Sequence, residues 1–295
     1  YIDSTATLNM QANALSIGGD YVNDGTFSYS STQTTTLTAT TTGHSLDSGT
    51  SSWYNITTSG TGGWITSTDT LNINGNLTLA TGTFDNATND ATINVTGNVT
   101  MDNTQTNMGD ATWTVSGNFD NYHVTTFNDD ASTLVMNGGS SGSPVDLISN
   151  SKMLYNVTIY AGAYVQVPST GLQIATAGTV TVNGNLSIAA NKIFYNLGGD
   201  TKVGSAGVIT GDGTYRVLHQ SKLSQMDGTI DVRNFNIAGD HTASYAIVPA
   251  TYDSAVVTIN TLYLGDYSWI PSAGTYEFSG GVTFGGNLSS TGTYT

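Results

Sequence analysis

The chain has 295 residues, of which only 9% are charged, and 21 acidic against six basic residues give a net charge of −15. So few Lys and Arg cannot build a basic patch that follows a phosphate backbone, which excludes nucleic acid as an expected partner. The absence of cysteine excludes disulfides and thiolate metal sites. No apolar run is long enough to cross a bilayer, so we expect no membrane-spanning segment.

Residue usage predicts an all-β chain. Ser and Thr together number 80, and Glu277 is the single Glu among the 21 acidic residues. Asp is typical of turns and Glu of helices, whereas Thr, Val, Ile and Tyr favour strands. We therefore expect strands and turns with little helix.

Residues 1–30 are interpreted as the first coils, with short strands that precede a corner at Gly18-Gly19-Asp20. A Thr-rich run follows at 32–42, in which Leu37 and Ala39 are the apolar residues. Thr is a good strand former, and its alternation permits a strand with one hydroxylated face. We interpret this run as a strand and not as a linker.

Leu71, Ile73, Leu77 and Leu79 alternate on either side of Gly75-Asn76, which predicts two short strands joined by a corner. Gly allows the chain to turn without a steric clash, and Asn tolerates the left-handed conformation and can stack as a ladder. Similar corners recur at Ile17-Gly18-Gly19, Val95-Thr96-Gly97-Asn98, Val115-Ser116-Gly117-Asn118, Val182-Asn183-Gly184-Asn185 and Phe284-Gly285-Gly286-Asn287.

The repeat of this corner predicts a parallel β-helix, or β-solenoid, in which each coil buries its apolar face only against its neighbours. About 20 to 25 residues per coil correspond to roughly 12 to 15 coils in the whole chain. We expect regular coils over residues 1–204. Residues 205–295 are less regular and are expected to form either further coils or a second β domain such as a β-sandwich.

A longer repeat carries Tyr-Asn-hydrophobic-Thr at residues 54–57 and 155–158, with a weaker copy at 233–236, and each copy is followed by a Gly-Asn corner. This arrangement resembles the repeats of large secreted β-helix proteins of archaea and bacteria, which include S-layer, sheath, filament and adhesin-like surface proteins. The resemblance implies a secreted or cell-surface structural role, with self-assembly and glycosylation.

Eight Asn-x-Ser/Thr sequons occur, which is about the number that chance gives in so Ser/Thr-rich a chain, so their positions are more informative than their count. Sequons at corners can present Asn to solvent, but the same Asn can instead form a self-bonded ladder that leaves no room for a glycan. The glycosylation candidates are Asn55, Asn76, Asn98, Asn156, Asn185 and Asn287.

Asp and Asn cluster at two turns, where Asp20 and Asp24, and then Asp85 and Asp90, offer the hard oxygen ligands that calcium prefers. Neither cluster matches the nonapeptide of calcium-binding β-rolls, so capping of the turn by these side chains is the competing interpretation. We expect no cofactor, with calcium as the one candidate ion.

Three functions remain open. The first is an extracellular structural protein whose partner is another copy of itself, arranged head to tail or laterally in a filament, sheath or S-layer-like lattice. The second is an adhesin or carbohydrate-binding module that uses Trp53, Trp64, Trp113, Trp269 and the 16 Tyr, although these rings also suit a core.

The third function, a polysaccharide lyase or hydrolase, is the weakest. Its paired carboxylates would have to come from Asn128-Asp129-Asp130, which is better interpreted as a turn because adjacent strand residues point to opposite faces. The local basic cluster of Arg216, His219 and Lys222 is better explained as a salt-bridged surface. We therefore expect no enzymatic activity.

Overall fold

The computed structural model describes residues 1–150, 152–169, 174–218, 222–226, 228–238, 256–263, 275–278, 282–283 and 293–294, with only the backbone for residues 218, 222–226 and 234 onward. The described elements are all strands, and nearly all of them pair in parallel, so the all-β parallel β-solenoid is confirmed. Two compact units divide the chain, Tyr1–Val135 (unit 1) and Met136–Thr295 (unit 2). Each unit is described by itself.

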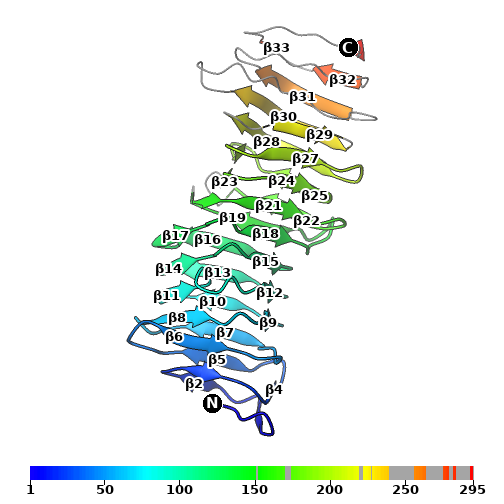
Figure 1. Cartoon of the computed structure of the whole chain (residues 1–295). Coiled ribbons are helices and arrows are strands. Elements are labelled where there is room, and N and C mark those ends of the chain that lie inside the picture. Colours follow the sequence, from blue (N-terminus) through cyan, green and yellow to red (C-terminus); the bar gives the residue numbers. More distant parts are fainter. Residues whose placement is uncertain are drawn as a thin grey trace. The chain divides into compact units, whose positions relative to one another are not determined.

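Three parallel sheets build most of unit 1, and in Figure 1 their strands stack coil upon coil. Sheet I contains β2 (Leu15–Ile17), β5 (Thr34–Leu37), β7 (Asn55–Thr58), β10 (Leu77–Leu79), β13 (Val99–Asp102) and β16 (Phe119–His123). Sheet II contains β3 (Tyr21–Val22), β6 (His44–Asp47), β8 (Gly63–Thr66), β11 (Gly82–Asp85), β14 (Thr104–Asn107) and β17 (Thr126–Asn128). Sheet III contains β9 (Leu71–Ile73), β12 (Ile93–Val95) and β15 (Thr112–Val115).

Outside these three sheets, β1 (Thr7–Gln11) pairs with β4 (Thr26–Tyr29). β18 (Thr133–Met136) follows β15 in the hydrogen-bonded order of its sheet and spans the boundary between the units. The Thr-rich run forms β5, with Thr35 and Leu37 buried and Thr34 and Thr36 half-buried. The prediction of a strand with one hydroxylated face is therefore confirmed.

The core of unit 1 consists of columns of side chains, one from each coil. In sheet I, Ile56, Leu77, Val99 and Phe119 are partners in successive strands, and each is 0% exposed. Neighbouring residues of the same strands point outward, because side chains alternate along a strand. Because these four residues pair in parallel and in register, the alternation in the sequence becomes a buried apolar column.

Unit 2 is built on the same principle. Sheet IV contains β21 (Asn156–Ile159), β24 (Val180–Val182), β27 (Asp200–Val203) and β29 (Lys222–Met226). Sheet V contains β19 (Val145–Ile148), β22 (Tyr164–Val167), β25 (Asn185–Ile188), the first part of β28 (Val208–Leu218) and the first part of β30 (Thr229–Ala238).

Sheet VI contains β20 (Met153–Leu154), β23 (Ile174–Thr176), β26 (Ile193–Asn196) and the second parts of β28 and β30. In sheet V, the core column consists of Val165, Leu186, Ile209 and Ile230, and each of these side chains is 0% exposed. Four more strands follow in parallel pairing, namely β31 (Val256–Tyr263), β32 (Thr275–Phe278), β33 (Val282–Thr283) and β34 (Thr293–Tyr294).

The structure forms about 10 turns, fewer than the 12 to 15 that the sequence predicts. The prediction divided all 295 residues by the repeat, whereas turns are seen only over the described part of the chain. The expected change in character after residue 204 falls only partly within the described residues and remains a prediction.

The corners need Gly to avoid a steric clash, as expected, but the clash would be with the neighbouring coil. Gly75, Gly97 and Gly117 do not have left-handed φ angles, and neither do Asn76 and Asn98. Instead the backbones approach closely, because Gly97 N donates to Gly75 O at 2.8 Å and a Cβ on Gly97 would lie 2.5 Å from that same oxygen. Close stacking of coils, and not a left-handed turn, excludes a side chain here.

Candidate functional site

An asparagine ladder runs along one corner of unit 1. The side-chain Oδ1 of Asn55 accepts a hydrogen bond from Asn76 N, Asn76 Oδ1 accepts one from Asn98 N, and Asn98 Oδ1 accepts one from Asn118 N, each at 2.8 Å. Each Asn therefore satisfies a backbone donor that the turn leaves without a strand partner. The expected ladder is confirmed.

The ladder leaves the amide nitrogens of its exposed members free. Asn76 and Asn98 are both exposed, and neither Nδ2 has a hydrogen-bond partner in the described part of the chain. A glycan replaces one hydrogen on Nδ2 and leaves Oδ1 able to accept, so the ladder and a glycan are compatible at these two residues. The expectation that a self-bonded ladder leaves no room for a glycan does not follow from this geometry.

The other glycosylation candidates differ in their surroundings. Asn55 is half-buried and donates from Nδ2 to Thr34 Oγ1 at 3.3 Å, while Asn156 and Asn185 are half-buried on β21 and β25. Asn287 lies outside the described residues. Occupancy of all six sequons remains a prediction.

One further sequon, at Asn86, points into the core. Its side chain is 0% exposed, and Nδ2 donates to Ala91 O at 3.0 Å and to Met108 O at 2.8 Å. A glycan at this nitrogen would break both bonds. Asn86 therefore acts as an internal bridge between coils.

The four candidate calcium ligands do not gather at one point. Asp20 accepts from Ser45 N at 2.9 Å and lies 3.2 Å from His44 Nδ1, whereas Asp24 accepts from Tyr1 Oη at 2.7 Å. These two bonds at Asp20 lower the pKa of its carboxyl, the backbone N–H having the larger effect.

In the second pair of candidate ligands, one carboxylate caps its own turn and the other bonds to a distant part of the chain. Asp85 accepts from Ala87 N at 2.9 Å, and Asp90 accepts from Asp110 N at 2.7 Å. Among the described residues, no group of three or more His, Cys, Asp or Glu side chains is placed to hold a metal. Of the four carboxylates, Asp85 caps its own turn, whereas the printed partners of the other three lie at least 20 residues away in the chain. Calcium binding remains a prediction.

Most of the tryptophans serve the interior. Trp53, Trp64 and Trp113 are 1%, 2% and 0% exposed, and the Trp53 ring lies 4.7 Å from Tyr21 and 4.8 Å from Phe27, measured between ring centroids. The core interpretation of these three rings is confirmed. Trp269 lies outside the described residues.

The segment Asn128-Asp129-Asp130 ends a strand and begins a turn, as expected. Asp129 O accepts from Ser132 N at 3.0 Å, and Asp130 has a left-handed φ of 44°. Burial raises the pKa of Asp129. Arg216 lies over the Tyr195 ring, with 5.2 Å between Cζ and the ring centroid, while His219 is outside the described residues.

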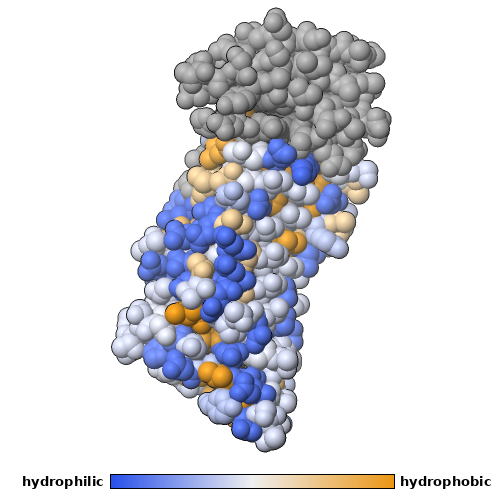
Figure 2. Space-filling view, viewed as in Figure 1, coloured by the Kyte–Doolittle hydropathy of each residue, from blue (hydrophilic) through white to orange (hydrophobic). Residues whose placement is uncertain are grey.

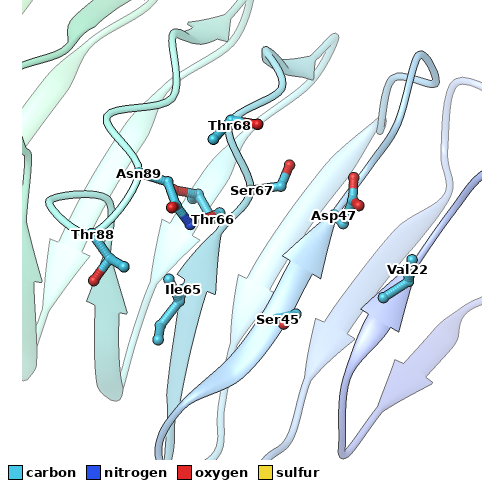
Figure 3. Close-up of a pocket in the computed structure, with 9 residues that line it drawn as sticks. All are labelled: Val22, Ser45, Asp47, Ile65, Thr66, Ser67, Thr68, Thr88 and Asn89. Atoms are coloured by element: carbon cyan, nitrogen blue, oxygen red, sulfur yellow. Dashed lines mark hydrogen bonds between the residues drawn. The ribbon is translucent and has the colours of Figure 1, made fainter.

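A groove of about 440 Å³ opens on the outer side of sheet II, as Figure 3 shows. Val22 and Ile65 give it an apolar surface, and Asp47 adds a carboxylate that accepts from Gly49 N at 2.9 Å. Asp85 is the strand partner of Ile65, so a second carboxylate lies beside the groove. The remaining lining residues are Ser45, Thr66, Ser67, Thr68, Thr88 and Asn89.

The outer side of sheet VI carries a run of apolar and aromatic side chains. In the view of Figure 2, hydrophilic residues cover most of the described surface, with hydrophobic ones scattered among them. On sheet VI, by contrast, the outward positions of successive strands are apolar or aromatic and end in a cation. We call this the apolar face, defined by Met153, Tyr155, Ala175, Ala177, Tyr195, Leu197 and Arg216.

Neither of these surfaces was predicted from the sequence. The groove depends on side chains from several coils, which only the register brings together. The apolar face had a local signal, because Met153-Leu154-Tyr155 and Phe194-Tyr195 lack the apolar-polar alternation of the other strands.

No described element is a helix long and apolar enough to span a membrane. Comparisons with known proteins found no matching family model, curated relative or solved structure.

Proposed function

We propose that this chain is a secreted structural protein of the cell surface whose copies associate into a filament, sheath or S-layer-like lattice. The observation that carries the proposal is the register that sheet I keeps from β5 to β13. In sheet I, Thr36, Thr57, Thr78 and Thr100 are partners in four successive strands and all point outward, so inner and outer surfaces repeat with the coil. A solenoid of this kind is a scaffold that presents a periodic surface.

The mechanism is mechanical. Each coil is joined to the next by parallel strand ladders on several sides and, in unit 1, by the asparagine ladder along a corner. A pull along the stack is shared by many backbone hydrogen bonds in each interface between coils, and the dry interior keeps water from competing for them. With 9% charged residues, the hydroxyl-rich outer surface allows copies to approach closely.

Electron microscopy of the native, unextracted material tests this proposal. We expect long uniform filaments or sheets in which stacked coils repeat at about 4.8 Å. Dispersed single copies at the concentration found in the native material would contradict it.

Glycosylation belongs to the same proposal, and Asn76 and Asn98 are its best-supported sites because they are exposed and their Nδ2 atoms are free in the described structure. Peptide mass spectrometry of the native protein is the measurement. We expect glycan mass on one or both of these residues and none on the buried Asn86.

A second candidate function is favoured by one observation. Tyr155 and Tyr160 flank β21 and are 37% and 57% exposed, as suits stacking against sugar rings in an adhesin. Pull-down with insoluble chitin and cellulose tests it. Retention of the wild-type chain that is lost in Tyr160→Ala would support an adhesin, and no retention would rule out binding to these two polymers.

A further inference from the structure

We propose that the apolar face of one copy docks into the groove of a second copy, so that the assembly grows by one repeated contact between sheet VI and sheet II. The inference rests on the proposed self-assembly and identifies the surfaces that carry it.

The apolar face has the features of an interaction surface. Met153 is 41% exposed and Tyr155 is 37% exposed, and they are two of the four large apolar or aromatic side chains with this exposure in the described structure. Next to them in register lie Ala175 and then Tyr195, which continue the apolar and aromatic outward positions across the sheet. A contiguous apolar patch on a surface otherwise rich in Thr and Asn marks a site of association.

The charge on this face selects the partner. Arg216 is the strand partner of Tyr195, and its guanidinium has no hydrogen bond or ion pair to any described residue. The chain carries 21 acidic and six basic residues, so a cation on an apolar surface is suited to an acidic surface of the same protein.

The groove on sheet II has the complementary chemistry. Val22 and Ile65 supply apolar contact area, and the carboxylates of Asp47 and Asp85 lie beside them. An apolar side chain such as Met153 can enter a groove of about 440 Å³ while Arg216 pairs with a carboxylate at its edge. One contact therefore buries apolar area and neutralises charge.

The two surfaces belong to different units of the chain, so the contact is heterologous. A patch that fits a pocket elsewhere on an identical molecule leaves one free patch and one free pocket after each addition. Unless the rotation closes a ring, such a contact continues into a fibre or lattice. This supplies the open growth that the proposed function requires.

Sedimentation velocity and negative-stain microscopy over a series of concentrations test the inference on the full chain. We expect Met153→Asp to raise the concentration needed for assembly by about 30-fold or more, because it buries an unpaired charge of the same sign as the groove. Ala175→Asp at the middle of the face serves as a second variant. Thr181→Asp, an outward residue of sheet IV, is the matched control and should assemble like wild type.

A charge exchange identifies the partner surface. Arg216→Asp and Asp47→Arg should each weaken assembly, and the double variant should recover a large part of the loss, since the exchanged charges meet between copies. Circular dichroism confirms that each variant is folded.

The outcomes separate the two proposals. A wild-type chain that stays monomeric at every concentration overturns the proposed function and this contact with it. Assembly of wild type and Met153→Asp at the same concentration leaves self-assembly standing but overturns the contact. Failure of the charge exchange to restore assembly overturns the groove as the partner.

Discussion

The two units share the same buried apolar interior, but they differ in their corners and in their outer faces. In unit 1 an uninterrupted ladder runs from Asn55 to Asn118, and glycines stack beside it. In unit 2 the equivalent bond runs from Thr179 N to Asn156 Oδ1 at 2.8 Å, and the two positions that would continue the ladder are Thr179 and Asp200 in place of Asn. The dry interior is therefore the constant requirement of the fold, whereas the corner ladder is a local device that individual coils can omit.

The outer faces differ in the same way. The outward column of sheet I in unit 1 consists of hydroxyl side chains, while the apolar face of unit 2 presents Met153, Ala175 and Tyr195. Because outward residues make no contribution to the inner columns, their chemistry can change without changing the coil. Outward residues are accordingly where the two units differ in surface chemistry.

Substituting a corner glycine should produce the largest effect on unit 1. Gly97→Val places a side chain against Gly75 O and the Asn76 side chain, so the coils must separate locally. We expect a loss of about 3 kcal/mol or more in the free energy of unfolding, measured by denaturant titration.

Removal of a whole coil should lower the free energy of unfolding less than this one substitution does. Deleting residues 77–98 joins Asn76 to Val99, and because Leu77 and Val99 are strand partners, the inner column and the ladder remain in register. We expect a folded chain with the same β-type circular dichroism spectrum. Equal loss of folding in the deletion and in Gly97→Val would contradict the independent coil as the building unit.

Breaking one step of the asparagine ladder should have an intermediate effect. Asn98→Ala leaves Asn118 N without its acceptor, and we expect a loss of about 1 kcal/mol in unfolding free energy. Asn98→Asp keeps the acceptor and is the matched control, with a smaller change. If the two variants lose the same stability in unglycosylated protein, the ladder bond contributes nothing.

The smallest expected effect is on the stability of the fold at low pH. The pKa of Asp20 is lowered in the fold by Ser45 N–H and His44, so its stabilising contribution is complete above the unfolded pKa and is lost as pH falls through the folded one. Asp20→Asn should therefore flatten the low-pH side of the stability curve slightly. Denaturant midpoints between about pH 6 and pH 2 provide the measurement.

The coil and its corners could be predicted from the sequence because both are local patterns. Leu71, Ile73, Leu77 and Leu79 alternate around Gly75-Asn76, and the structure buries all four apolar side chains. The reason for the glycine could not be predicted in the same way, since it depends on how closely one coil approaches the next. The same limit applies to the groove, where Val22 and Ile65 are brought together only by the stacking of three coils.

Cryo-electron microscopy of assemblies grown from the purified wild-type chain tests the account most directly. We predict parallel coils spaced at about 4.8 Å within each copy, and copies joined through Met153 and Arg216 on one side and Ile65 and Asp47 on the other. Antiparallel strands, or chains that remain single at every concentration, would contradict it.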